Sequence, residues 1–514
     1  MALSKRDRFT LFAIFILVFI LLVFQYAGGN PEYTWPDSDS SVFPLTAIHL
    51  MQGEEFPWYF YEQDYIGTLP VLIIWGLFSV FGQSHLWVDF LYAAVYAGIT
   101  TLIAAFIIRR IGPIPTLVFA FGYALFPTIL AIPRALDSGT HNFSLLLGFA
   151  SGYLFSLFWQ YRLNKQAHKL LNSPLTISML LILCCLTYWS SPLGMVYLTA
   201  IVAIVVISSR NHTALINDKK ILLIYQHYFS EQWRLRLGEV FNHWHWLILV
   251  TVLVAFFLIF DKALFNLILI YDIYFYHLFS RIDEPFNFIW IFSSLVVLIA
   301  VIYRERETIM TMVKGDVVEI PWHLVILFVP VFNMLVALPT FEYLVDFTSA
   351  RYFESLQWIG LIAWMLFISY FGRKNFTSIL FILILINSWY SEDIPEYQRL
   401  LSPKKTAEFI QQRHDDRERL IKDEKMLIDF LEQRKLYYGF ADYWLAYRLT
   451  YLSHERFIIS SYYESRYPKY DDLIKENGVD FYLFNIDELG EGREVAEDNG
   501  KNNGKIFGNL ILFY

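Results

Sequence analysis

Cysteine is nearly absent from this 514-residue chain, and charge is scarce. The two cysteines, Cys184 and Cys185, are neighbours in an apolar run, so they neither bridge each other readily nor build a metal site. Only 17% of the residues are charged, whereas 56% are hydrophobic and the mean hydropathy is +0.42. This composition excludes an ordinary soluble enzyme and a disordered chain, and the net charge of −8 excludes a nucleic acid as partner.

The charge is unevenly distributed along the chain. Charged residues make up about 12% of residues 1–392 but about 34% of residues 393–514. The sequence therefore predicts a transmembrane domain over 1–392 and a soluble domain over 393–514. In the latter, a charged helix over 404–435 precedes the strand-like runs RFIIS and DFYLFN, which flank a helix near 469–477.

These elements predict a small α/β domain, in which residues 490–505 would form a flexible loop. Four residues of this domain could line a sugar or acceptor surface, although core and docking roles are favoured for them. They are Tyr443, Trp444, Tyr447 and Arg448.

Long hydrophobic runs fill the first 392 residues. About 20 apolar residues cross the hydrocarbon of a bilayer. Runs that approach this length predict about 11 transmembrane helices, at 9–26, 85–108, 114–133, 141–160, 174–190, 192–209, 244–260, 285–303, 321–339, 354–372 and 375–391. The shorter run at 68–81 is expected to form a re-entrant or interfacial helix.

Basic residues alternate between the loops that join these runs. Most lie in one set of loops, at 5–8, 109–110, 162–169, 210–236, 304–314 and 373–374. The opposite set contains only Arg134, Lys262, Arg281 and Arg351. Since cytoplasmic loops are enriched in lysine and arginine, we expect a cytoplasmic N-terminus and, after an odd number of spans, a C-terminal domain on the outer side.

The first outer loop, residues 27–66, contains no lysine or arginine. It carries the carboxylates of Glu32, Asp37, Asp39, Glu54, Glu55, Glu62 and Asp64. It is also rich in aromatic residues, which prefer the headgroup level of a membrane, and its segment 42–51 is apolar enough for an interfacial helix.

Asp37 and Asp39 are the candidates for chemistry in this loop. Two residues apart, their side chains would lean to the same side of an extended segment. Such a pair can hold a divalent cation such as Mg²⁺ or Mn²⁺, or one carboxylate can act as general base while the other tunes it. The competing interpretation is that Asp39 or Ser40 caps the helix that follows.

Ionisable residues also mark two other outer segments. Arg134, Asp137 and His141 lie between the third and fourth predicted spans, where charge near the bilayer is costly and tends to be functional. A salt bridge between Arg134 and Asp137 is an equal alternative. Arg351 precedes the tenth span, where its guanidinium could bind a phosphate or reach the lipid headgroups.

The first outer loop resembles that of GT-C-type glycosyltransferases, the polytopic enzymes that include protein O-mannosyltransferases and the lipid A aminoarabinose transferase. The resemblance rests on DSSVFPLTAIHLMQGEEFPWYFYEQDYIGTLP, with Asp39 at the position of the family's catalytic base. Glu62 and Pro70 depart from the family pattern. Weaker matches follow in SGTHNFSLLLG with His141, TYWSSPLG, Arg351-Tyr352, and FADYWLAYRLTYLSHERFIIS with SRYPKY.

The resemblance implies a transferase that takes a sugar from a polyprenyl-phosphate donor at the outer face of the membrane. Asp39 would deprotonate the hydroxyl of an acceptor lipid, glycan or protein, and arginine would hold the leaving phosphate. The residues implied to bind substrate or lipid phosphate are Arg134, Asp137, His141, Arg351, Tyr352, Gln63 and Tyr65. The C-terminal part resembles that of bacterial members, which implies the inner membrane with this domain in the periplasm.

Two other functions fit the same pattern. One is an oligosaccharide transferase or ligase that uses a lipid-pyrophosphate donor. The other is a lipid or polysaccharide transporter, or a membrane scaffold, without enzymatic activity. Transporters usually contain internal repeats and midplane ionisable groups. The ionisable residues here gather at the outer edge of the spans, which favours the transferase.

Overall fold

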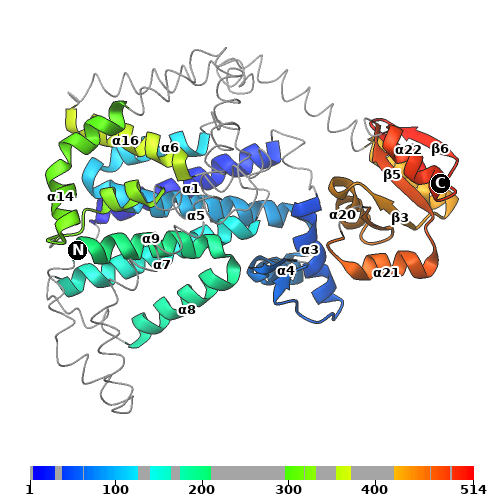
Figure 1. Ribbon diagram of the computed structural model, residues 1–514, viewed down its shortest axis with the longest axis horizontal. Coiled ribbons are helices and arrows are strands. Elements are labelled where there is room, and N and C mark those ends of the chain that lie inside the picture. Colours follow the sequence, from blue (N-terminus) through cyan, green and yellow to red (C-terminus); the bar gives the residue numbers. More distant parts are fainter. Residues whose placement is uncertain are drawn as a thin grey trace, which may run out of the picture.

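The computed structural model describes residues 4–28, 38–61, 63–125, 139–163, 174–209, 296–317, 319–330, 355–371, 422–462, 465–486 and 489–514. Within these ranges the protein is mostly helical, with a bundle of helices at one side and a small mixed sheet at the other (Figure 1). The predicted spans at 244–260 and 375–391 lie outside the described residues.

Helices occupy most of the runs that the sequence marked as apolar. The bundle contains α1 (Lys5–Gly28), α5 (His85–Ile111), α6 (Pro113–Leu125), α7 (Gly139–Leu163), α8 (Pro174–Ser190), α9 (Pro192–Ser208), α14 (Arg306–Lys314) and α16 (Ser355–Phe371). Residues 296–304 and 322–330 are also helical. The turn between α5 and α6 follows from its sequence, because Gly112 adopts a φ of +84° and Pro113 opens the next helix.

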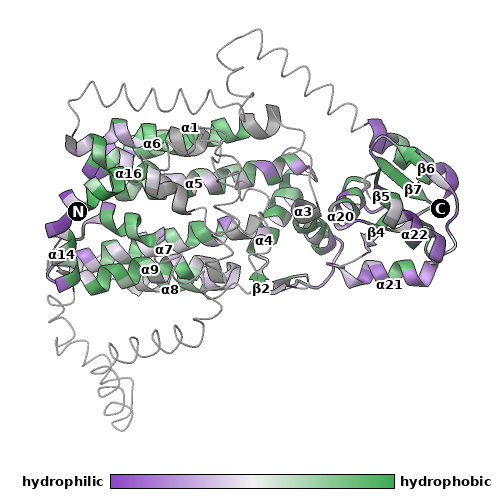
Figure 2. Ribbon diagram, turned by 45° about the horizontal axis from the view of Figure 1, so that its top comes forward, coloured by the Kyte–Doolittle hydropathy of each residue, from purple (hydrophilic) through white to green (hydrophobic). Residues whose placement is uncertain are grey.

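Two of the described helices are long and apolar enough to cross a membrane. They are α5 and the part of α7 from Asn142 to Gln160. Figure 2 shows apolar residues along most of the bundle and polar residues concentrated in the C-terminal domain, which agrees with the uneven charge of the sequence. The count of about 11 spans goes beyond these two helices and stays a prediction.

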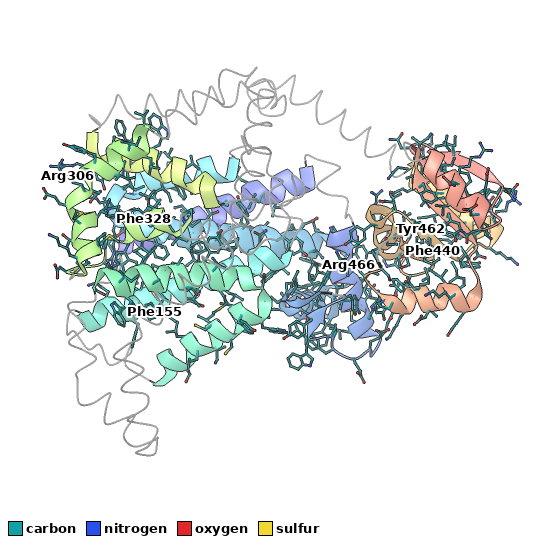
Figure 3. All side chains as sticks on the ribbon, viewed as in Figure 1. Phe155, Arg306, Phe328, Phe440, Tyr462 and Arg466 are labelled. Carbon is teal, nitrogen blue, oxygen red and sulfur yellow. The ribbon has the colours of Figure 1, made fainter. Side chains whose placement is uncertain are left out.

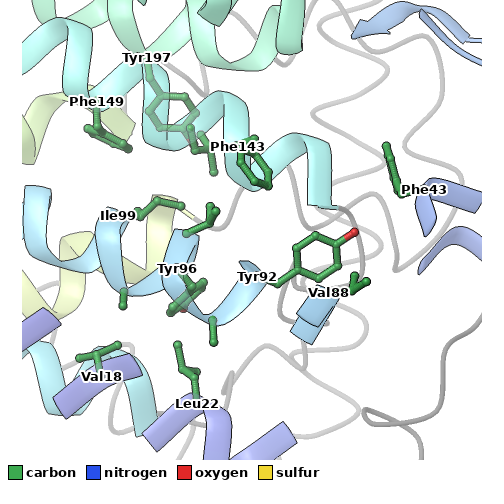
Figure 4. Packing of buried hydrophobic residues seen from close by; sticks show 14 of the residues in the cluster. Val18, Leu22, Phe43, Val88, Tyr92, Tyr96, Ile99, Phe143, Phe149 and Tyr197 are labelled. Atoms are coloured by element: carbon green, nitrogen blue, oxygen red, sulfur yellow. The ribbon is translucent and has the colours of Figure 1, made fainter. Parts of the chain in front are cut away.

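Aromatic and branched side chains fill the centre of the bundle. Figure 4 shows Val18 and Leu22 of α1, Tyr96 and Ile99 of α5, and Phe149 of α7 converging with Tyr197 of α9. Glycines bring α7 and α9 close together. A Cβ added at Gly152 would lie 2.5 Å from Cδ1 of Ile201, so this spacing of small residues, Gly148-x-x-x-Gly152, permits an approach that larger side chains would block.

One end of the bundle is joined by a polar cluster around Glu305, which precedes α14 and is 5% exposed. Arg110 at the end of α5 donates to its carboxylate at 3.0 Å, and the Tyr370 hydroxyl of α16 donates to the same oxygen. His323 Nε2 lies 3.4 Å from that oxygen. We call these four residues the bundle-end cluster. It ties together the ends of helices that are far apart in the sequence.

The C-terminal domain has a five-stranded sheet in the order β4-β3-β5-β7-β6. The strands are β3 (Tyr438–Ala441), β4 (Ile458–Ser461), β5 (Phe481–Asn485), β6 (Gly504–Phe507) and β7 (Leu510–Phe513). β3 pairs in parallel with β4 and β5, whereas β7 is antiparallel to β5 and β6. The connecting helices are α20 (Tyr443–Leu452), α21 (Pro468–Asn477) and α22 (Leu489–Asp498), so the domain is α/β.

The flexible loop predicted over 490–505 is wrong. Its first half is α22, and its last residues open β6. Two interactions that the composition obscures account for the helix. Arg493 pairs with Glu497 one turn later at 2.7 Å, and Ala496 is fully buried in the cluster formed with Tyr482 and Phe484 of β5.

Candidate functional site

The described part of the predicted first outer loop folds into a helix and a short hairpin, and the run at 68–81, expected to be re-entrant or interfacial, forms a second helix. These are α3 (Ser38–Met51), β1 (Tyr59–Phe60), β2 (Gln63–Gly67) and α4 (Leu69–Phe81). The hairpin lies against α3, because Phe60 of β1 stacks on Phe43 with ring centroids 4.5 Å apart. The loop is therefore a packed unit at the end of the bundle away from α14 (Figure 1).

α3 begins earlier than the sequence suggested. Ser38 is its first residue, so Asp39 lies in its first turn, and the extended arrangement expected for Asp37 and Asp39 does not hold for Asp39. The reason is local, since serine and aspartate satisfy free backbone amides at a helix N-terminus and the negative charge is favoured by the helix dipole. Asp37 lies outside the described residues.

The surroundings of α3 also differ from the expectation. An interfacial helix would expose one face to lipid, but residues 41–49 are all buried. α4 packs on one side of α3 and α20 of the C-terminal domain on another. α4 has the exposed apolar surface instead, formed by Trp75, Val80 and Phe81. The C-terminal domain thus covers the helix that we expected at the membrane surface.

Three glycines join segments from distant parts of the sequence. A Cβ at Gly67 would stand 2.1 Å from the carbonyl oxygen of Trp189, one at Gly194 would stand 2.3 Å from that of Ser144, and one at Gly148 would stand 2.4 Å from that of Gly194. The indole of Trp189 also donates to the carbonyl of Trp58 at 2.7 Å. The end of β2, the α8–α9 junction and the first half of α7 therefore meet backbone to backbone.

A second set of contacts joins this loop to the C-terminal domain. We call it the docking network, formed by His49, Gln52, Glu54, Tyr61, Glu455, Tyr467, Lys469 and Tyr470. At its centre, His49 Nε2 lies 2.9 Å from Oε1 of Glu455 and 3.1 Å from the Tyr470 hydroxyl. His49 Nδ1 lies 3.1 Å from the Tyr61 hydroxyl, so both ring nitrogens have partners.

The rest of the docking network surrounds this centre. Gln52 donates to Oε2 of Glu455 at 2.8 Å, while Tyr467 and Lys469 donate to Oε2 of Glu54 at 2.6 and 3.0 Å. The Tyr467 ring stacks on His49 at 4.6 Å between centroids. Figure 3 shows Arg466, the neighbour of Tyr467, on the side of the domain that faces the helices of the loop.

The docking network favours ionised carboxylates and neutral phenols. Burial opposes ionisation of Glu455, but hydrogen bonds from His49, Tyr470 and Gln52 outweigh it and lower the pKa of its carboxyl. Burial also raises the pKa of the Glu54 carboxyl, but the hydrogen bonds from Tyr467 and Lys469 outweigh this effect and lower the pKa overall. Burial raises the pKa of the Tyr61, Tyr467 and Tyr470 phenols, which therefore stay protonated and donate.

Several predicted site residues lie outside the described residues, namely Arg134, Asp137, Arg351 and Tyr352, like Asp37. Of the others, only the backbone is placed. Gln63 and Tyr65 belong to β2, and His141 lies in the first turn of α7. The divalent cation expected at Asp37 and Asp39 stays a prediction, because neither carboxylate is among the described side chains.

The residues weighed as a sugar surface in the C-terminal domain are largely core residues. Tyr447 is fully buried, and its hydroxyl accepts from the backbone amide of Arg466. Arg448 forms an ion pair with Glu424, which is 2% exposed. The side chain of Trp444 lies outside the described ones, whereas Tyr443 is half-buried beside Arg466.

Sequence reasoning did not identify the docking network. His49 was counted within an apolar helix, and Glu54 was only one of the seven carboxylates of the first outer loop. The signal that could have found it is the pair of strings LSHERF and SRYPKY, which contain Glu455, Tyr467, Lys469 and Tyr470. Both strings combine polar and aromatic residues, and SRYPKY leads into the helix predicted near 469–477.

Comparison with known proteins gives no relative: no protein-family model matches the chain, and neither a curated protein nor a solved structure is significantly similar to it.

Proposed function

We propose that the chain is a polytopic membrane glycosyltransferase that moves a sugar from a polyprenyl-phosphate donor to an acceptor hydroxyl at the outer face of a bacterial inner membrane. Asp39 takes the proton of that hydroxyl, the hydroxyl oxygen attacks the anomeric carbon, and the bond between that carbon and the lipid phosphate breaks. An arginine at the membrane surface, Arg134 or Arg351, binds the leaving phosphate.

The observation that carries this proposal is the meeting of three motif segments. The strings that resemble GT-C enzymes are separated in the sequence, and three of them contain Gly67, Gly148 and Gly194. These glycines make the close backbone approaches between the hairpin, α7 and the α8–α9 junction. Unrelated chance matches would have no reason to meet at one end of a bundle.

The distribution of charge supports the proposed orientation. Arg110, Arg306 and Lys314 lie at the end with the bundle-end cluster. All three belong to the basic loops for which the sequence predicts a cytoplasmic location. The acidic first loop lies at the opposite end with the C-terminal domain (Figure 1). Exposed apolar side chains on the outer helices, such as Phe12 of α1 and Leu181 of α8, suit contact with lipid.

The proposal is tested by Asp39→Asn in purified membranes supplied with a polyprenyl-phosphate sugar extract, with glycan transfer as the readout. Loss of the general base is expected to slow transfer by about 10²–10⁴-fold. The matched control is Glu55→Gln, which neutralises an exposed carboxylate of the same loop and should leave the rate unchanged. Wild-type transfer by a correctly folded Asp39→Asn protein would overturn the proposal.

A further inference from the structure

The helix that bears Asp39 has a sequence that does not stabilise a helix on its own. α3 has only 14 residues and contains Pro44, which lacks a backbone donor and disfavours the helix interior. Isolated helices of this length are marginal in water even with good helix formers. The burial of residues 41–49 shows that packing against neighbouring elements supplies the missing stability of α3. The helix α20 of the C-terminal domain is one of these elements.

Glu455 is one of the residues through which the C-terminal domain reaches the buried face of α3, together with Tyr467 and Tyr470. Its carboxylate contacts His49 and Tyr470 through one oxygen and Gln52 through the other. The His49 side chain is 3% exposed and that of Glu455 16% exposed, so the contact between these two residues is shielded from water. A shielded, charge-assisted contact is stronger and better defined than one on an open surface.

The backbone at Glu455 provides a second, independent observation. Glu455 has a φ of +58° and His454 a φ of +53°, in the left-handed region that residues other than glycine rarely adopt. Such a conformation persists where the surrounding structure over-determines it and tends to occur at functional sites. Here it turns the chain directly after α20, at the residue whose carboxylate meets His49.

We propose that Glu455 is a positioning residue for the transfer reaction: by docking on His49 it fixes α3, and with it the first turn that carries Asp39, against the end of the bundle. His49 and Asp39 are ten residues apart, about 15 Å along a helix. A shift at the docked end therefore moves the base relative to the substrate. This inference rests on the proposed function for what α3 positions, but the docking itself does not.

The test uses the full chain in lipid nanodiscs and the variant Glu455→Gly. Glycine removes the carboxylate while relieving the left-handed backbone, so the C-terminal domain keeps its fold. Backbone hydrogen exchange of residues 41–54 is expected to become at least about tenfold faster, as local opening becomes easier. Lys435→Gly is the matched control, because it relieves a left-handed residue with φ +58° that is exposed and outside the docking network.

Transfer kinetics supply the readout that a purely structural role would not move. Glu455→Gly should lower kcat about tenfold with little change in KM for the donor, and Glu455→Gln, which retains an acceptor for His49, should recover part of the rate. Unchanged exchange over 41–54 would overturn the docking role. Faster exchange with an unchanged kcat would overturn the positioning role.

The two proposals fail in different ways. If Asp39 is not the base, Asp39→Asn retains transfer, while the exchange of residues 41–54 still responds to Glu455→Gly. If Glu455 does not dock α3, the exchange is unchanged even when Asp39→Asn abolishes transfer. The exchange measurement needs no substrate, so it decides the docking role on its own.

Discussion

The two ends of the helical bundle each place a glutamate beside a histidine and a tyrosine, but they differ in the charge that the glutamate meets. Glu305 contacts Arg110, whose charge is permanent, together with His323 and Tyr370. Glu455 meets His49 and the neutral donors of Tyr470 and Gln52. The Glu305 carboxylate is therefore paired with a permanent charge, whereas at the other end, which we call the docked end, the Glu455 carboxylate is held by His49 and by neutral donors.

The largest expected effect concerns the sides of the membrane on which the two ends lie. In a chain with Cys184→Ala and Cys185→Ala, Asn502→Cys in the C-terminal domain should react with an impermeant maleimide added to intact cells. Met310→Cys on α14, 53% exposed in the structure, should react only after the membrane is opened. Labelling is all or none, because the reagent does not cross the bilayer. Equal labelling of both positions in intact cells would refute the orientation.

The next effect concerns the backbone approach at the docked end. Gly67→Ala forces a Cβ to within 2.1 Å of a backbone oxygen that cannot move aside cheaply, so we expect a loss of about 3 kcal/mol in stability. Gly76→Ala in α4 is the control, since nothing lies within 4 Å of its added Cβ and alanine favours the helix by about 0.5–1 kcal/mol. Thermal unfolding in detergent measures both. Equal melting temperatures for the two variants would contradict the close approach.

The smallest effect is the response of the two ends to acid. Because docking lowers the pKa of Glu455 and Glu54, their contribution is complete above the ordinary glutamate pKa of about 4.3 and is lost as the pH falls through the lower folded-state values. Contact with His323, followed by the Tyr370 hydrogen bond, lowers the pKa of Glu305 much further against the opposing effect of burial. The docked end should therefore loosen at a higher pH than the bundle end.

Spin labels at each end measure this difference in the cysteine-free chain. Labels at Met51 and Leu473 span the docking network, and labels at Ile114 and Met310 span the bundle end; all four side chains are exposed. As the pH falls below about 4, the first distance distribution should broaden while the second stays narrow. Simultaneous broadening of both would show that the two ends respond alike.

Local sequence patterns predicted the helices better than their surroundings. The apolar runs at 174–190 and 192–209 coincide with α8 and α9 almost residue for residue, because proline and the Ser-Ser pair mark their limits. The α/β fold of the C-terminal domain followed from alternating strand and helix signals. The α22 helix was missed because glycine-rich composition concealed an ion pair and one buried alanine.

The candidate site was only partly accessible to such reasoning. Asp39 was found because it is an acidic residue and because it stands at the position of the catalytic base in the string that resembles GT-C enzymes. His49 was not, because a single histidine in an apolar helix gives no sign of its partner. That partner is a glutamate 406 residues away, and only tertiary structure brings the two together.

The distance in sequence between His49 and Glu455 also sets an order of events during synthesis. A ribosome that adds about 5–20 residues per second needs roughly 20–80 s to make the intervening chain. Through that interval α3 has already been translated but lacks its partner from the C-terminal domain. The nascent protein therefore carries α3 without the docking network until the C-terminal domain has been made, and a chaperone or protease that meets the nascent chain would encounter α3 in that undocked form first.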